Sequence, residues 1–170
     1  MKSLRIAVPL FLLLTATFAF SQTAAQKSFD QLKTLTGSWE GKNSKGDPLR
    51  VSFRDTAGGS ALMSEIIGEG HEDMISMIHM DGANRLMLTH YCGAGNQPRM
   101  TASTSADGKI ITFNFLDGTN LSSPDSGRMQ RVVFTIVDPN HHTEDWTFAA
   151  GPGKEMKEFF DLHRNEIAQK

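Results

Sequence analysis

The regular spacing of turn signals is the feature that most constrains this chain. After Trp39, dipeptides such as Asp81-Gly82, Asp107-Gly108 and Asp117-Gly118 recur about every ten residues. Glycine supplies positive φ, and aspartate or asparagine hydrogen-bonds the turn that it begins. The segments between such turns have the length of strands rather than of ordinary helices. Many short, evenly spaced strands predict a β-sandwich or a β-barrel.

Short apolar runs between the turns predict about ten strands. The predicted strands are Gly37–Gly41, Leu49–Arg54, Ala61–Ile67, Met74–Met80, Arg85–Cys92, Arg99–Ser103, Lys109–Leu116, Arg128–Val137, Thr143–Ala149 and Glu155–Arg164. Phe29, Leu32 and Leu35 have helical spacing, and they predict a helix long enough to cap one end. We therefore expect an all-β, antiparallel, up-and-down barrel of about ten strands with a short N-terminal capping helix.

The N-terminal segment Met1–Ser21 has the layout of a secretory signal peptide. Lys2 and Arg5 precede a run that is almost entirely apolar, and small residues follow at Ala19 and Ser21. Cleavage is expected after Ser21, or as late as residue 25. Residues 22–170 then form a single domain, exported to the periplasm or the medium, with no membrane segment after cleavage.

Composition excludes several classes of protein. The chain has 17 Lys+Arg against 19 Asp+Glu, which gives no reason to expect a nucleic-acid partner. Its single cysteine excludes an internal disulfide framework and a four-cysteine zinc site. We find no Gly-x-Ser-x-Gly, His-Glu-x-x-His or phosphate-binding glycine loop, so no enzymatic activity is predicted.

Strand alternation in the hairpin around Asp81–Asn84 predicts which residues share a face of the sheet. Pairing His79 with Leu86 puts seven residues on one face: Ile75, Met77, His79, Leu86, Leu88, His90 and Cys92. The opposite face is also largely apolar, so one face is expected to meet the core and the other a partly apolar cavity. A barrel of this kind either holds an apolar guest or packs its interior with the same side chains.

The stretch Phe29–Gly41, reading FDQLKTLTGSWEG, resembles the start of lipocalin-like, or calycin, barrels. In those barrels a short helix closes one end and a Gly-x-Trp motif, here Gly37 and Trp39, opens the first strand. The resemblance implies that an arginine of the last strand packs across the tryptophan, and Arg164 is the matching residue. Such an arginine–indole contact contributes about 0.5–2 kcal/mol.

Two further stretches, Thr89–Cys92 and Gly95–Met100, look like a family of uncharacterised, exported, lipocalin-like bacterial proteins. A more distant resemblance is to nitrobindin, through Gly37–Gly41 and Leu162–Arg164, and it implies heme bound by His163. Strand alternation gives a competing interpretation, because it places His163 on a solvated face with Lys157 and Asp161.

No metal site is predicted. Under the predicted pairing, His79 and His90 lie about 13 Å apart along the strands, which is too far for shared zinc ligation with Cys92. His141 and His142 follow a Pro-Asn turn, where we expect them to be solvated, with adventitious binding of copper or zinc as the alternative.

We expect the barrel to bind a small apolar or amphiphilic molecule, with no cofactor unless the heme alternative holds. The candidate ligand-binding residues are His90, Tyr91, Asn96, Phe113, Phe115 and Trp146. Asn96 and Tyr91 belong to a polar cluster that either orients a ligand or satisfies backbone groups of the Gly93–Gly95 loop. A third possibility is a filled barrel that acts through its surface. The oligomeric state stays open.

Overall fold

The structure is a computed structural model that describes residues 22–68 and 73–165. The predicted signal peptide, Met1–Ser21, lies outside the described residues. Within the described part of the chain, no helix has the length and apolar character needed to span a bilayer.

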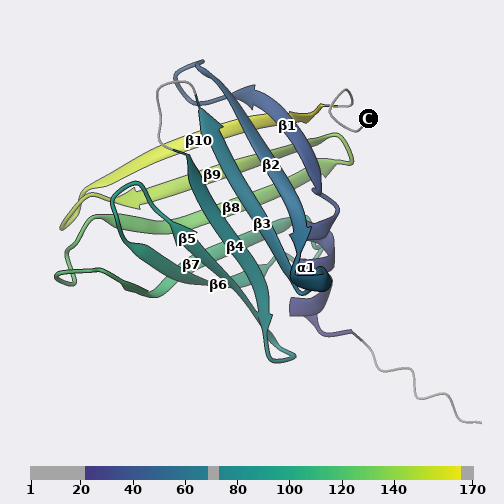
Figure 1. Ribbon diagram of the computed structural model, residues 1–170, viewed down its shortest axis with the longest axis horizontal. Helices are drawn as coiled ribbons and strands as arrows, with labels where there is room; N and C mark the ends of the chain where they lie inside the picture. Colours follow the sequence, from purple (N-terminus) through teal and green to yellow (C-terminus); the bar gives the residue numbers. More distant parts are fainter. Residues whose placement is uncertain (1–21, 69–72, 166–170) are drawn as a thin grey trace, which may run out of the picture.

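The strands form one closed antiparallel barrel, as predicted (Figure 1). Each strand pairs with its neighbours in sequence, and the barrel closes where the first strand pairs with the last. The bounds are β1 Gly37–Lys42, β2 Pro48–Thr56, β3 Ala61–Gly68, β4 Met74–Asp81, β5 Arg85–Tyr91, β6 Gln97–Thr104, β7 Ile110–Thr119, β8 Arg128–Asp138, β9 His141–Ala149 and β10 Glu155–Arg164. A short 3-10 turn, η1 Ala57–Gly59, connects β2 to β3.

The capping helix α1 runs from Ala24 to Lys33 and lies across one end of the barrel (Figure 1). The Thr23 side chain accepts a hydrogen bond from the Gln26 N–H, which satisfies an N-terminal donor of the helix. The helix contacts β4, β5 and β6, and its buried residues include Phe29 and Leu32. It therefore starts five residues before the segment that the apolar spacing predicts, and it covers the end of the barrel as expected.

The barrel closes tightly between β1 and β10. A Cβ atom placed on Gly41 would lie 1.8 Å from the Asp161 carbonyl oxygen, so only glycine allows this approach of the two strands. At the other end of β1, Gly37 has a φ of 131°, which favours glycine where the chain enters the strand.

One hydrophobic core occupies the interior of the barrel and includes residues of α1. Inward residues alternate with outward ones along each strand, as the period of a pleated strand requires. The largest fully buried side chains are Leu32, Leu35, Trp39, Leu62, Ile78, Leu86, Leu88, Met100, Ile111, Phe113, Phe134 and Leu162.

The predicted register of the β4–β5 hairpin is wrong by one residue. Asp81 pairs with Arg85, so three residues form the loop and His79 lies opposite Met87 instead of Leu86. Because strand side chains alternate, this slip reverses the face of β4 relative to β5. The inward face carries Ser76 and Ile78 of β4 together with Leu86, Leu88 and His90 of β5, two sets that the predicted register had placed on opposite faces.

Candidate functional site

The helix end of the barrel is sealed by Trp39 and Arg164. The guanidinium of Arg164 lies 4.3 Å from the centroid of the Trp39 ring, which confirms the predicted contact. Arg164 also donates hydrogen bonds to the carbonyl oxygens of Thr34, Thr36 and Pro139. The Trp39 Nε1–H donates to the Leu35 carbonyl at 2.7 Å. The interior of the barrel is therefore closed at this end. Outside it, a surface hollow of about 620 Å³ lies between the end of α1, the β6–β7 turn and the end of β8, and its lining includes Leu35, Ile136 and Arg164.

A row of buried polar side chains crosses three strands inside the barrel. Ser64 of β3 pairs with Ser76 of β4, and Ser76 pairs with His90 of β5. All three are almost completely buried. The Ser76 hydroxyl and His90 Nδ1 share a hydrogen bond of 2.9 Å. We call Ser64, Ser76 and His90 the interior polar row.

Two atoms of the interior polar row have no hydrogen-bond partner. They are the Ser64 hydroxyl oxygen and His90 Nε2. Burial lowers the pKa of His90 from 6.5 to about 4, so the imidazole is neutral at neutral pH. An orphaned buried polar atom costs about 1–3 kcal/mol, which makes the pair an unusual feature of a packed interior.

A second polar set, on β9, faces the interior polar row across the barrel. His142, Glu144 and Trp146 share the inward face of this strand, and all three are buried. Glu144 accepts a hydrogen bond from Trp146 Nε1 at 2.8 Å and lies 3.2 Å from His142 Nε2. The His90 and Trp146 ring centroids lie 5.1 Å apart, so the two sets are in contact.

His142 and Glu144 look at first like a catalytic base and its orienting carboxylate, yet their surroundings are closed. The Trp39 and His142 rings are perpendicular, with their centroids 4.3 Å apart. The centroid of the Phe53 ring lies 5.7 Å from that of His142. Since aromatic rings cover His142, a substrate has no path to its imidazole, and we assign these residues to the support of Trp146.

An apolar pocket of about 160 Å³ opens at the mouth opposite α1. It lies between the start of β2, the end of β3 and the start of β4, whereas α1 contacts the other end of the barrel. Its apolar walls include Leu49, Ile66 and Phe160, with Asn43 and Glu158 also lining it. Ile66 is two residues from Ser64 on the same strand, or about 6.6 Å. The pocket therefore lies one inward position above the interior polar row.

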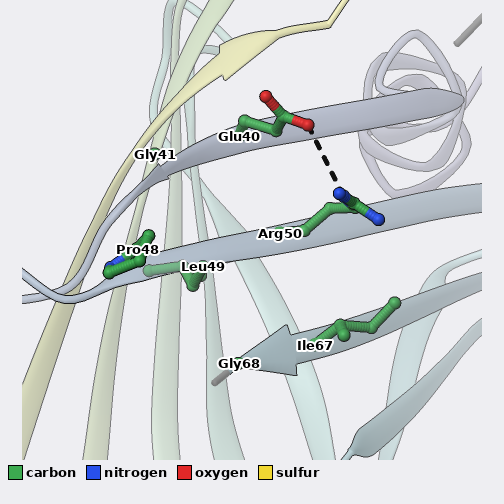
Figure 2. Close-up of a pocket in the computed structure, with 7 residues that line it drawn as sticks. All are labelled: Glu40, Gly41, Pro48, Leu49, Arg50, Ile67 and Gly68. Carbon is green, nitrogen blue, oxygen red and sulfur yellow. Dashed lines mark ion pairs between the residues drawn. The ribbon is translucent and has the colours of Figure 1, made fainter.

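A larger hollow of about 440 Å³ lies on the outer surface of β1, β2 and β3 (Figure 2). Glu40 and Arg50 form an ion pair across it at 3.5 Å, and Glu40 also accepts a hydrogen bond from Asn165. These charged groups are already partnered with one another. We therefore place the candidate site in the smaller mouth pocket, which lies one inward position from the row in which Ser64 and His90 atoms lack partners.

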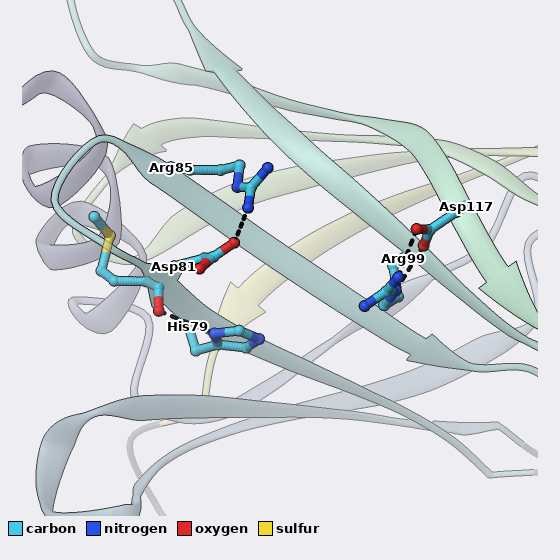
Figure 3. A network of polar contacts seen from close by, with 6 residues as sticks. His79, Asp81, Arg85, Arg99 and Asp117 are labelled. Carbon is cyan, nitrogen blue, oxygen red and sulfur yellow. Dashed lines mark hydrogen bonds and ion pairs between the residues drawn. The ribbon is translucent and has the colours of Figure 1, made fainter.

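The outer surface of β4 to β7 carries two ion pairs and a histidine, beside exposed apolar residues such as Leu116 (Figure 3). Asp117 accepts two hydrogen bonds from Arg99, at 2.6 and 2.5 Å, and Asp81 pairs with Arg85. His79 Nδ1 lies 3.1 Å from the Met80 carbonyl oxygen. Since His79 lies on this outer face and His90 lies inside, the two histidines share no site.

The structure brings together some of the candidate ligand-binding residues. His90 and Trp146 are in contact inside the barrel, and Trp146 packs near Phe134, which in turn packs against Phe113. Phe113 is part of the closed core rather than of the mouth pocket.

The other three candidates have different surroundings. Phe115 lies under the Arg128 guanidinium at 4.4 Å. The Asn96 side chain donates to the Gly127 carbonyl at 2.7 Å, so it satisfies backbone, although of a different loop from the one expected. Tyr91 is 49% exposed on the outer surface and does not face the interior.

His163, the residue that would bind heme by resemblance, lies outside the barrel. Its side chain is 64% exposed and stacks on the His141 ring, as strand alternation predicts. A heme ligand inside the barrel would have to come from the opposite face of β10, where Phe160 and Leu162 lie. The residues present therefore do not fit a heme held by His163 in the interior.

Sequence reasoning missed Ser64, Ser76, His142 and Glu144 as interior residues. Ser76 was grouped with Ile78, as observed, but the one-residue register error separated it from His90, and Ser64 was not singled out. His142 was expected to be solvated, and the structure shows it fully buried. Extending the alternation of Trp146 back along its strand would have placed Glu144 and His142 on the same inward face.

Neither protein-family models nor curated proteins match this sequence. Among solved structures, the crystal structure of Rv2717c from M. tuberculosis is similar, with a TM-score of 0.57 and 16% sequence identity. The alignment covers 82% of this chain and 98% of that chain. At this level of identity, the likeness supports the barrel fold and carries no information about a ligand.

Proposed function

We propose that the protein is an exported β-barrel that binds a small apolar or amphiphilic molecule through the mouth opposite α1. The observation that carries this proposal is an apolar pocket lined by Ile66, two residues along β3 from a row that contains two buried polar atoms without partners, Ser64 Oγ and His90 Nε2. The apolar Met1–Ser21 segment and the resemblance to exported lipocalin-like proteins support export.

The orphaned atoms favour a ligand with one polar end. Burying a hydroxyl and an imidazole nitrogen without partners destabilises the free protein, and a bound molecule can offset that loss by supplying the missing hydrogen bonds. Because His90 is neutral and fully buried, a neutral hydroxyl or carbonyl group suits it better than a carboxylate does.

The size of the pocket limits the apolar part of the ligand. About 160 Å³ is at the scale of a cavity that holds a benzene-sized molecule, and is smaller than the range of roughly 300–1,000 Å³ found for drug-sized ligands. A short alkyl chain or a single ring with one hydroxyl group therefore fits the proposal, whereas a long lipid chain does not.

The test is calorimetric titration of the purified protein with 1-hexanol. Ile66→Trp fills the mouth pocket, and Ile67→Trp adds the same bulk to the next residue, which faces outward. We expect saturable binding to the wild type and to Ile67→Trp, and at least a tenfold loss of affinity in Ile66→Trp. Circular dichroism and thermal melting establish that each variant is folded.

Equal binding to the two tryptophan variants would overturn the proposed site. No binding of 1-hexanol, phenol or their homologues by the wild type would overturn the function. It would favour a filled barrel that acts through its surface, for which the extensive interior packing already provides a basis.

A further inference from the structure

We infer that the outer face of β9 and β10 carries a site for a divalent transition-metal cation, formed by His141, Asp161 and His163. One ligand atom of each side chain lies within 4.8 Å of the other two. The site is on the barrel exterior at the helix end, so it is independent of the mouth pocket and of the proposed ligand.

The backbone register brings the two histidines face to face. His141 and His163 are direct partners in the β9–β10 ladder. The flanking hydrogen bond, from Arg164 N to the Asn140 carbonyl oxygen, makes them a non-hydrogen-bonded pair, in which side chains lie closest together. The imidazole rings stack with centroids 4.4 Å apart and an angle of 18° between their planes.

Asp161 supplies an oxygen ligand to the same point. Its Oδ1 atom lies 2.7 Å from His141 Nε2 and 3.7 Å from His163 Nε2. Asp161 and His163 are two residues apart on β10, so they project on the same side of the sheet. Tetrahedral ligands at 2.0–2.2 Å from zinc lie roughly 3.3 Å from one another, so small side-chain rotations would bring these atoms to bonding positions.

The donor set selects a class of metal ion. Two imidazole nitrogens and one carboxylate suit Zn²⁺, Cu²⁺ and Ni²⁺, whereas Ca²⁺ and Mg²⁺ prefer oxygen ligands. Without a cation, the two stacked imidazoles compete for one carboxylate oxygen. A cation would bind both Nε2 lone pairs and the carboxylate, with each neutral ring carrying its proton on Nδ1. Three protein ligands leave at least one position for water, which is typical of an exchangeable site rather than a closed structural one.

The charges on the neighbouring strand β1 are mixed. Glu40 of β1 is the direct ladder partner of His163, which places its carboxylate on the same outer face. The positive charge of Arg50 is paired with this carboxylate at 3.5 Å, so it does not point at the three ligands. Lys42 of β1 is the direct ladder partner of Asp161, so its ammonium group belongs to the same outer face and opposes part of the added charge. The proposal therefore rests on the geometry of the three donor atoms rather than on the net charge around them.

The test is calorimetric titration of tag-free protein with ZnCl₂, CuCl₂ and CaCl₂. We expect one Zn²⁺ per chain, tighter binding of Cu²⁺ as the Irving–Williams order requires, and no binding of Ca²⁺. His163→Ala should lower Zn²⁺ affinity at least tenfold, and Asp161→Asn should lower it less because the amide oxygen can still act as a ligand. His79→Ala is the matched control, since it removes a histidine from another part of the outer surface.

Zn²⁺ affinity that is the same in His163→Ala and in the wild type would overturn the site. So would Ca²⁺ binding equal to that of Zn²⁺, because it would indicate nonspecific attraction to carboxylates. Because His163 is largely exposed, its replacement leaves the barrel folded, and thermal melting provides the check. Zn²⁺ should also raise the melting temperature of the wild type and of His79→Ala, but not that of His163→Ala.

Discussion

At the residue scale, Ser64 and Ser76 differ in their hydrogen bonding but not in their burial. They are direct partners in the β3–β4 ladder, and both are about 1% exposed. The Ser76 hydroxyl bonds to His90, whereas the Ser64 hydroxyl has no partner. A buried hydroxyl without a partner costs stability, so the barrel retains at Ser64 a group that its folding does not need.

This contrast predicts opposite effects of two alanine substitutions. Ser64→Ala should raise the free energy of unfolding by about 1 kcal/mol, because it removes an unsatisfied buried hydroxyl. Ser76→Ala should lower it by about 1–3 kcal/mol, because it leaves His90 Nδ1 without a partner. Urea denaturation of both variants at pH 7 measures the difference. Equal destabilisation by the two substitutions would show that Ser64 has a structural partner.

The lowered pKa of His90 predicts a loss of stability in acid. Since the unfolded chain binds a proton near pH 6.5 and the folded protein only near pH 4, stability rises with pH across this interval. The stabilising effect of a neutral His90 is fully present above pH 6.5, and about 3 kcal/mol of it is lost as the pH falls to 4. Urea denaturation from pH 7 to pH 4, compared between the wild type and His90→Gln, isolates the contribution of His90 to the free energy of unfolding. Identical pH profiles for the two proteins would contradict the burial of His90.

At this scale, the sequence predicted single residues well where alternation was unambiguous. His163 is solvated as strand alternation predicts, and the Trp39–Arg164 contact is the one that the family resemblance implies. The Ser64–Ser76 contact could not be predicted, because it depends on the register of β4 and a serine carries no hydrophobic signal. His142 was misjudged because a nearby Pro-Asn turn suggested exposure, whereas its strand already begins at His141.

At the scale of elements, α1, β1 and β10 form one junction around Trp39. The indole is fully buried, donates to a backbone carbonyl, and has Arg164 across its face. Arg164 in turn bonds to carbonyls after α1 and in the β8–β9 turn. One side-chain pair thus connects three segments that are far apart in the sequence.

Trp39→Ala should lower the free energy of unfolding by about 3–5 kcal/mol, because it leaves a large cavity in the core. Tyr91→Ala is the control, since it truncates an aromatic residue that is half exposed, and it should cost less than about 1 kcal/mol. Guanidinium denaturation measures both. A cost below about 1 kcal/mol for Trp39→Ala would be incompatible with this junction.

Gly41→Ala should destabilise the β1–β10 closure. The added methyl group would meet the Asp161 carbonyl oxygen, a backbone atom that cannot move without displacing its strand. Overpacking of this kind costs about 1–3 kcal/mol, occasionally more. Lys42→Ala changes the exposed neighbouring residue and should be nearly neutral. Chemical denaturation that gives similar values for these two variants would contradict the close approach.

The elements themselves were largely predictable because glycine and aspartate mark their ends. The helix and all ten described strands were expected near their observed positions, with ends that differ by a few residues. The register between β4 and β5 could not be predicted, because the sequence Asp81–Asn84 is compatible with a two-residue or a three-residue hairpin loop. A one-residue difference there reverses one face of β4 and with it the composition of the interior polar row.

At the scale of the whole molecule, the closed barrel leaves no edge strand, and its two ends differ. Trp39 and Arg164 close the interior near α1, the helix that Figure 1 shows across one end of the barrel. The other end contains an apolar pocket one inward position above the interior polar row. The sequence predicted the closed end through its motifs. It gave no comparable signal for the open end, because a pocket depends on volumes left between side chains from several strands.

The most direct test of the proposed binding site is the imidazole nitrogen spectrum of the protein during titration with 1-hexanol. We expect the His90 Nε2 resonance to shift with the same saturation as the calorimetric binding curve, because the ligand hydroxyl supplies its missing partner. The resonances of His79, on the outer surface, should remain unchanged. Binding that saturates without moving His90, or a His90 resonance that moves no more than that of His79, would contradict the account.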